Sequence, residues 1–300
     1  METTIFQHLT KSQIEQLVHL IQKIVQAFSP IKIICYGYRT TTISDWSCFS
    51  FGDARVIPTF PTYDLMIVIK DDEKRQHHEI IEIAEQFAIP HNCNISIIVQ
   101  QLNTVNKGLE HGKRFISTVY NNGITLYNYG SALSIPRQEM EIAMLKKLIE
   151  DHWQNYFGMA NCFLMTANYC FENGWKKQTV FDLHQSVEHA CIAILRVCTG
   201  YRPTTHNLSR LLNLICNFSQ ELMVIFPRTT KEEIDLFNIL NRAYSEARYN
   251  EKYSVSEDVV KIIMGRVTTL LGLIEKLYER KCTSLRSILP VSFPLNIESQ

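Results

Sequence analysis

The first 130 residues alternate between short apolar runs and longer segments whose apolar side chains recur every three or four positions. The short runs are rich in β-branched residues and are bounded by polar or glycine positions, so they predict buried strands. The longer segments predict amphipathic helices. The expected elements are helix 9–28, strand 31–36, strand 63–69, helix 71–87, strand 95–99, helix 102–119 and strand 124–127. This alternation predicts helices packed on a sheet that need not be wholly parallel.

The pattern changes after the last expected strand, where helical periods replace the strand-like runs. Gly200 and Pro203 lie where one helix should end. The expected helices are 139–171, 177–199, 206–222, 230–247 and 255–281. We therefore expect an α+β domain with a mixed sheet over residues 1–134, an all-α helical bundle over residues 135–282 and an extended tail over residues 283–300.

The composition is that of a folded protein without a dominant charge. Of 300 residues, 46% are hydrophobic, and 30 Lys and Arg balance 30 Asp and Glu. We expect no strong global attraction to nucleic acid or to an anionic membrane. The first residues lack the basic start and apolar run of a signal peptide, and no apolar run reaches the roughly 18 residues that span a bilayer. Nine scattered cysteines without a C-x-x-C pair predict buried free thiols in a cytoplasmic protein.

Gly37 and Asp64 occupy places that suggest a phosphate-binding fold. One predicted strand leads to Gly37, and Asp64 lies near the start of the next strand. This arrangement resembles the nucleotidyltransferase fold of the DNA-polymerase-β-like superfamily. The resemblance implies that Gly37 opens a turn that holds nucleotide phosphates and that Asp64 is one of several acids that bind Mg²⁺, which bridges the reacting oxygens. Arg39 could bind a phosphate through two parallel hydrogen bonds, or lie solvated in a loop.

The acids that this chemistry needs are incomplete. Tyr38 stands where the family has serine, Thr62 stands where the family has its first aspartate, and the third strand carries no acid. One carboxylate does not hold a pair of Mg²⁺ ions. We therefore expect no cofactor, and Mg²⁺ only if Asp45 or Asp53 of the long intervening loop folds back beside Asp64.

The helical half carries a more specific motif. Residues Phe181–Ala190 read FDLHQSVEHA, and Thr205–Leu208 read THNL at the expected start of the next helix. Both segments resemble the HEPN domain, which implies a helical bundle that commonly forms a homodimer. Gln185 and Glu188 are three residues apart and share one helix face. This polar pair either satisfies backbone groups and a dimer contact or belongs to a site.

The catalytic motif of active HEPN ribonucleases is also incomplete. The resemblance implies an arginine followed by a histidine near the last helix, which supply a cation for the phosphate and a base for the ribose 2′-hydroxyl. Arg248 fits the arginine, but Tyr253 stands at the first position where histidine is allowed. His206 is the last histidine of the chain, and we expect His184 and His206 to be structural, with a site role as the alternative.

Basic side chains still gather around Arg248. Arg242, Arg248 and Lys252, together with nearby tyrosines, suit a nucleotide or RNA backbone through charge and stacking. The alternative is a solvated helix end at which Glu246 and Glu251 neutralise the basic groups.

The leading functional prediction is a non-catalytic regulatory or defence-type module that binds a nucleotide or nucleic acid. Its candidate binding residues are Gly37, Arg39, Arg242, Arg248 and Lys252. The resemblance to paired nucleotidyltransferase and HEPN proteins, many of them toxin–antitoxin pairs, implies such a history. The alternatives are an active nucleotidyltransferase that combines Asp64 with loop acids, a ribonuclease that uses Arg248 and Tyr253, and a purely structural interaction protein.

Overall fold

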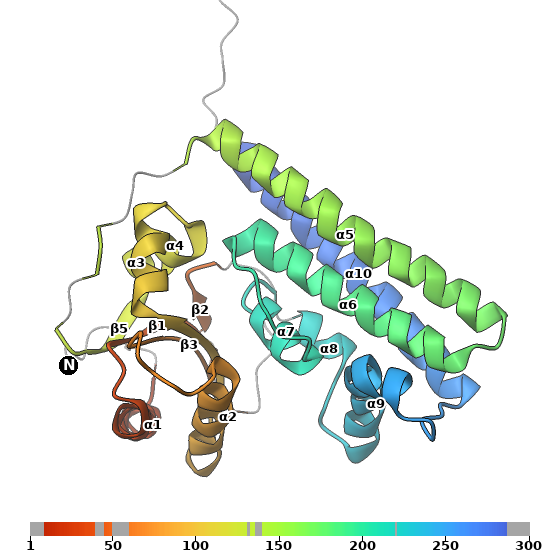
Figure 1. The fold of residues 1–300 in the computed structure, drawn as a ribbon, viewed down its shortest axis with the longest axis horizontal. Helices are drawn as coiled ribbons and strands as arrows, with labels where there is room; N and C mark the ends of the chain where they lie inside the picture. The colour runs from red at the N-terminus through yellow and green to blue at the C-terminus, as the bar shows by residue number, and fades with distance from the viewer. Residues whose placement is uncertain are drawn as a thin grey trace, which may run out of the picture.

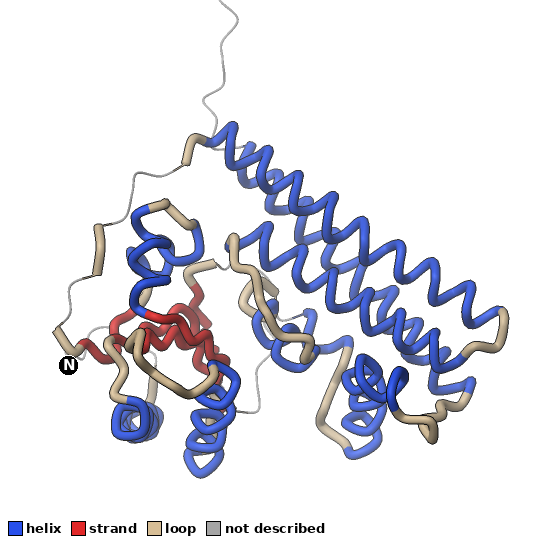
Figure 2. Tube along the Cα trace, in the orientation of Figure 1, coloured by secondary structure: helices blue, strands red, loops and turns tan. Residues whose placement is uncertain are grey.

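The structure of the chain is a computed structural model in which a sheet-containing N-terminal region lies beside a helical region (Figure 1). It describes residues 9–39, 45–49, 60–130, 133–135, 140–219 and 221–286, without the side chains of residues 45–47, 223 and 286. Figure 2 shows the strands gathered in the first region and helices throughout the second. The expected combination of an α+β fold and an all-α bundle is confirmed.

A mixed sheet forms the centre of the N-terminal region. Within the described residues its strands are β1 (Lys32–Arg39), β2 (Asp45–Ser47), β3 (Thr62–Ile69), β4 (Asn94–Gln101) and β5 (Ile124–Asn128). β1 is central, because it pairs antiparallel with β3 along one side and with both β2 and β5 along the other. β4 extends the sheet in parallel to β3. The sequence did not predict β2, because three residues are too few to show a period.

Helices cover both faces of this sheet. α1 (Lys11–Phe28) and α2 (His77–Ala88) pack on one face, and α3 (Leu102–Glu110) and α4 (Arg114–Asn122) pack on the other. A single turn of 3₁₀ helix, η1 (Ile89–His91), links α2 to β4. Neighbouring residues of β1 point to opposite faces, so Ile33 packs with α1 while Ile34 packs with α4. Because both faces are covered, β1 and β3 need the nearly continuous apolar sequences that they have.

The helical region is organised around one buried helix. Its elements are α5 (Ile142–Glu172), α6 (Lys176–Thr199), α7 (Leu208–Ile215), α8 (Glu221–Ile225), α9 (Lys231–Tyr249) and α10 (Glu257–Arg286). α6 contacts α5, α7, α9 and α10, and most of its side chains are buried. The two long helices α5 and α10 run beside it (Figure 1). A helix surrounded in this way must be apolar on nearly all sides, so its few polar side chains need partners.

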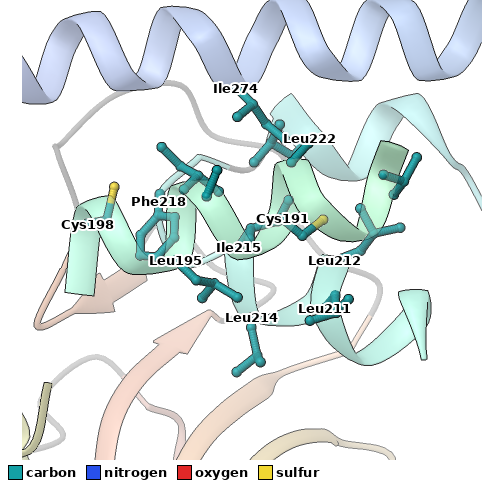
Figure 3. Close-up of a cluster of buried hydrophobic side chains, with 14 of the residues drawn as sticks. Cys191, Leu195, Cys198, Leu211, Leu212, Leu214, Ile215, Phe218, Leu222 and Ile274 are labelled. Atoms are coloured by element: carbon teal, nitrogen blue, oxygen red, sulfur yellow. The ribbon is translucent and has the colours of Figure 1, made fainter. Parts of the chain in front are cut away.

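The two regions share one hydrophobic core. Figure 3 shows Ile274 of α10 above α6, and Leu214 of α7 pointing away from α6 toward the strands of the sheet. At the same junction the rings of Phe115 and Tyr201 lie 4.8 Å apart between centroids. Buried side chains therefore continue from the sheet into the helical bundle without a break. The functional groups of the two regions are consequently held in a fixed relation to each other.

Three predicted segments differ from the structure in detail. The expected helix 102–119 is interrupted near Gly112, whose φ of 63° suits glycine, so two helices form. The expected helix 206–222 is divided into α7 and α8. α10 continues through Arg286, four residues into the predicted tail, and Leu285 near its end is buried in the core.

The cysteines are free thiols, as their scattered spacing predicts. All nine cysteines lie within the described residues and are free, and six of them are buried. In the part of the chain that the structure describes, no helix combines the length and the apolar character needed to cross a bilayer.

Candidate functional site

Gly37 lies inside a strand and does not open a turn. In β1 it pairs with Asp64 of β3 on one side and with Ser47 of β2 on the other. A register shift between Cys35 and Gly37 accommodates these partners, and β1 continues to Arg39. The predicted phosphate-holding turn after Gly37 is therefore wrong, because the pairing with β2 extends the strand beyond it.

Arg39 and Asp64 form a buried ion pair at the end of this strand. Arg39 Nη2 donates a hydrogen bond to Asp64 Oδ1 at 3.0 Å, and Nη1 lies 2.9 Å from Asp64 Oδ2. Nη1 also donates to Oδ1 of Asn217, which follows α7 in the helical region, at 3.0 Å. All three side chains are buried. Burial raises the pKa of the Asp64 carboxyl, and the Arg39 guanidinium opposes that rise. Arg39 is therefore neither a solvated loop arginine nor a free phosphate ligand.

The side chains around Asp64 do not fit Mg²⁺. The Arg39 guanidinium already contacts both carboxylate oxygens of Asp64. On the neighbouring strand β4 the residue paired with Asp64 is Ser96, which is not an acid. Among the described residues there is no group of three or more His, Cys, Asp or Glu side chains that could hold a metal. Asp45 begins β2 without a described side chain, and Asp53 lies outside the described residues, so the predictions for these two acids stay predictions.

A cleft of about 470 Å³ lies between the two regions, bounded by α2, β4, α7 and the segment before α7. Arg210 is its cation, and the Nη2 atom of Arg210 lies 3.3 Å from Glu85 Oε2 and 3.7 Å from Glu82 Oε1. Two carboxylates thus face one guanidinium. None of the predicted phosphate-binding residues lines the cleft. Its charge does not favour a phosphate group.

Polar groups converge on Glu188, a buried carboxylate in the middle of α6. His206 Nδ1 lies 2.9 Å from Glu188 Oε1, and Gln185 Nε2 lies 3.4 Å from Glu188 Oε2. His184 Nδ1 lies 3.8 Å from the same Oε2. The structure therefore brings the predicted pair of Gln185 and Glu188 into contact and adds both histidines. His184 is fully buried, whereas the His206 side chain is 54% exposed.

Tyr244 and Arg248 of α9 complete this cluster. The His206 ring stacks on the Tyr244 ring with 4.4 Å between centroids and 8° between planes. The Arg248 guanidinium lies 4.0 Å from the centroid of the same ring, and Arg248 Nε donates to the carbonyl oxygen of Tyr244 at 2.6 Å. Within the described residues no carboxylate lies within 4 Å of this exposed guanidinium. We call His184, Glu188, His206, Tyr244 and Arg248 the His206–Arg248 site.

The protonation of this site follows from its burial. Burial lowers the pKa of His184 to about 4. A hydrogen bond with the backbone of His206 opposes this, and the charges of His206 and Arg248 add to it, so the ring is neutral near pH 7. In the His206–Glu188 contact the carboxylate accepts, so Nδ1 carries the hydrogen. When the ring is neutral, Nε2 of His206 then has a free lone pair. The site combines an exposed imidazole, an aromatic ring and a cation.

The helical region also matches a known family. Residues 153–277 match the family model described as HEPN domain. This segment of the chain is similar to a HEPN domain. The match covers α6 with Glu188, the segment before α7 with His206, and α9 with Arg248, so the whole His206–Arg248 site lies inside the matched residues.

Two further comparisons add little. No curated protein matches the chain. One similar solved structure is the crystal structure of a nucleotidyltransferase-like protein from Exiguobacterium sibiricum 255-15, with 11% identity and a TM-score of 0.28 over 90% of this chain and 79% of that one. This likeness is too weak to support an argument about the N-terminal region.

The other basic residues predicted near Arg248 do not join the site. Arg242 is exposed six residues earlier on α9, which places it about 120° around the helix from Arg248. Lys252 is exposed in the turn after α9, and its backbone N–H donates to Asn250 Oδ1 at 3.0 Å. Glu246 is held by Asn250 Nδ2 at 2.6 Å and not by Arg248.

Tyr253 is unsuited to the role of a base. Its hydroxyl donates to the carbonyl oxygen of Ile239 at 3.1 Å, and burial raises the pKa of Tyr253 to about 12. The imidazole nearest to Arg248 in this cluster precedes it in the chain, because His206 packs onto the Tyr244 ring that Arg248 also contacts.

Two site residues escaped the sequence analysis. Asn217 gave no signal, because an asparagine after a helix is common and its partner Arg39 is 178 positions away. Tyr244 could have been found, since it precedes Arg248 by four residues and helical spacing places both side chains on one face.

The buried ion pair predicts a large effect of Asp64→Ala on stability. This change leaves the Arg39 guanidinium buried without its counter-charge, so we expect the free energy of unfolding to fall by about 3–5 kcal/mol. The double variant Asp64→Leu/Arg39→Met, which removes both charges, should lose clearly less. Urea denaturation followed by tryptophan fluorescence measures these changes.

An exposed ion pair provides the control for this experiment. Glu85→Ala removes a partner of Arg210 that is partly exposed, and we expect a loss under about 1 kcal/mol. A loss for Asp64→Ala no larger than that of Glu85→Ala would contradict the assignment of Arg39 and Asp64 as a structural lock.

Proposed function

We propose that this chain is a regulatory or defence-type module that binds nucleotides or RNA through its HEPN domain. The N-terminal region serves as a non-catalytic partner. Arg39 supports this division, since its guanidinium occupies the position beside Asp64 that a metal ion would need. A transferase requires metal ions that bridge the reacting oxygens, and a buried guanidinium cannot be displaced without leaving two charges unpaired.

The uncompensated guanidinium of Arg248 carries the proposal. It is exposed, it lies over the Tyr244 ring, and no described carboxylate neutralises it. A planar guanidinium binds a phosphate through two parallel hydrogen bonds. The rings of Tyr244 and His206 sit next to it and are of the kind that contact nucleobases. A purely structural protein would instead tie Arg248 into internal ion pairs.

Arg248→Ala should weaken binding of AMP, ATP, GTP and single-stranded RNA about tenfold or more, because a charged hydrogen-bonding group is worth roughly 1.5–3 kcal/mol. Removal of Mg²⁺ should change the affinity little. Ligand-induced shifts of the melting temperature and fluorescence anisotropy with labelled RNA measure both effects.

Arg242→Ala is the matched control, because it removes the same charge from another face of the same helix. We expect it to change affinity less than about twofold. Equal losses in the two variants, or no binding of any of these ligands by the wild-type chain, would remove the support for this site.

A second candidate function is metal-independent RNA cleavage, favoured by the contact of His206 with Glu188. In this reaction His206 Nε2 takes the proton of a ribose 2′-hydroxyl, whose oxygen attacks the adjacent phosphorus. The bond to the 5′-oxygen breaks, a 2′,3′-cyclic phosphate forms, and the 5′-oxygen takes a proton from water to leave as a hydroxyl group. The Arg248 guanidinium offsets the charge that develops on the phosphate. Glu188 acts as a positioning residue, since it fixes the tautomer of the imidazole.

If this candidate is correct, wild-type protein cuts RNA in the presence of EDTA, and His206→Ala lowers the rate about 10²-fold or more. A substrate with one 2′-deoxy nucleotide at the cleaved position should resist. His78→Ala, which removes an exposed imidazole from α2, should cut at the wild-type rate. Absence of cleavage, or cleavage that survives His206→Ala, rejects the candidate and leaves binding as the function.

We also propose that the HEPN domain forms a homodimer through the outer face of α5. Large apolar side chains are exposed along this helix, among them Met144, Met159, Met165 and Tyr169, and Met165 is 71% exposed. Met165 and Tyr169 are four residues apart and share one face. A second copy of this surface would bury these side chains in a symmetric contact.

Met165→Asp should therefore convert a dimer to a monomer, because a charge would be buried in the contact. Analytical ultracentrifugation of the wild type should give twice the chain mass. Ile89→Asp is the control, since Ile89 is equally exposed at 71% but lies in the N-terminal region. A wild-type chain that remains monomeric at high micromolar concentration would exclude this interface.

A further inference from the structure

Cationic side chains gather where the N-terminal region meets the end of α6. Arg114, at the start of α4, donates from Nη2 to the carbonyl oxygens of Arg196 at 2.6 Å and of Val197 at 2.8 Å. Arg196 Nη2 lies 3.1 Å from His152 Nε2 of α5. The Arg196 guanidinium also lies 5.3 Å from the centroid of the Tyr156 ring. Two guanidinium groups from different regions therefore occupy one junction.

The positive charge of this junction is not balanced by nearby groups. Within the described residues no carboxylate lies within 4 Å of either guanidinium. The end of α6 supplies the equivalent of about half a negative charge, against two full positive charges. Burial and the two arginines lower the pKa of His152 to about 4, so its ring is neutral near pH 7. The exposed carboxylate of Asp151 opposes this lowering of the His152 pKa. Lys281 is a further cation near the junction, because the charge of Arg114 lowers its pKa.

Both guanidinium groups retain unused donors. The Nε atoms of Arg114 and Arg196 are buried and have no hydrogen-bond partner in the protein. Such donors are expensive to leave unpaired. The Nε atoms are enclosed, but Arg114, Arg196 and His152 as whole residues are only partly buried, so a solute would meet the outer nitrogens of the two guanidinium groups. Adjacent planar guanidinium groups with spare donors match the oxygens of a phosphate group.

We propose that Arg114 and Arg196 form a phosphate-binding site at the junction of the two regions. The site is separate from the His206–Arg248 site. Arg196 is twelve positions after His184 on α6, which corresponds to about 18 Å along the helix. Its ligand is a phosphate group, which a free phosphorylated small molecule or the backbone of an RNA can supply. Because Arg114 belongs to the N-terminal region, this site gives that region a direct role in ligand binding.

The ring signals of His152 offer a local test in the full chain. Inorganic pyrophosphate, and separately a single-stranded RNA of about twelve nucleotides, are titrated while the histidine ring resonances are followed by NMR. We expect a saturable shift of the His152 signal, because its Nε2 contacts the Arg196 guanidinium. A response to both probes indicates a general phosphate site, and a response to RNA alone indicates recognition of the backbone.

Variants of Arg196 separate binding from structure. Arg196→Gln should weaken the response about tenfold, and Arg196→Lys should retain part of it, because a point charge replaces a bidentate donor. The backbone carbonyl oxygens of Arg196 and Val197, which accept hydrogen bonds from Arg114, remain in both variants. Lys147→Gln, which removes an exposed charge from α5, should change the affinity less than about twofold. Melting temperatures confirm that the variants remain folded.

Two results overturn the inference. One is a His152 signal that does not move, or moves equally with sodium chloride of the same ionic strength. The other is an undiminished response in folded Arg196→Gln protein. Shifts of the His206 signal without shifts of the His152 signal would leave the HEPN site intact and reject only the junction site.

Discussion

The buried contact of Arg39 with Asp64 and Asn217 determines how the two halves of this protein work together. Asp64 of β3 is enclosed in the sheet, and Arg39 of the neighbouring strand β1 places its guanidinium against both carboxylate oxygens. The third partner comes from the helical side, so neither half satisfies its own polar groups alone. A buried charge without its partner is strongly destabilising. The hydrogen bond from Arg39 to Asn217 links this enclosed pair to the helical region.

In the helical region the buried polar groups are satisfied in another way. α6 is surrounded by other helices, and its central carboxylate, Glu188, is satisfied mainly by side chains that reach it from outside the helix or from one turn away. One of these, His206, is half exposed. Its ring stacks on the Tyr244 ring, and the exposed Arg248 guanidinium lies over that same ring. At the Arg39–Asp64 contact the charges are enclosed and paired, whereas at Arg248 a cation remains available to solvent. This contrast is why we propose Arg248, and not Arg39, as a ligand-binding residue.

Much of the fold could be read from local patterns. The strands around Ile33 and Ile67 and the helices around Glu188 and Ile274 follow from apolar periodicity, because side-chain direction repeats with the backbone of each element. The three-residue strand β2 could not be read in this way, since its pairing with β1 forms only after the chain folds. The Gly37 prediction failed for the same reason. A glycine between apolar and polar residues indicates a turn unless a neighbouring strand prolongs the pairing.

The sequence by itself determined which chemical groups are available: one aspartate on the second predicted strand, a polar pair in an apolar helix, and an arginine without a histidine after it. Tertiary structure alone decided how these groups are used. It turned Arg39 inward to Asp64, and it brought His206 from the segment before α7 to the aromatic ring beside Arg248. These contacts join residues that are far apart along the chain, and local spacing carries no information about such distances because they are set by packing of whole helices and sheets.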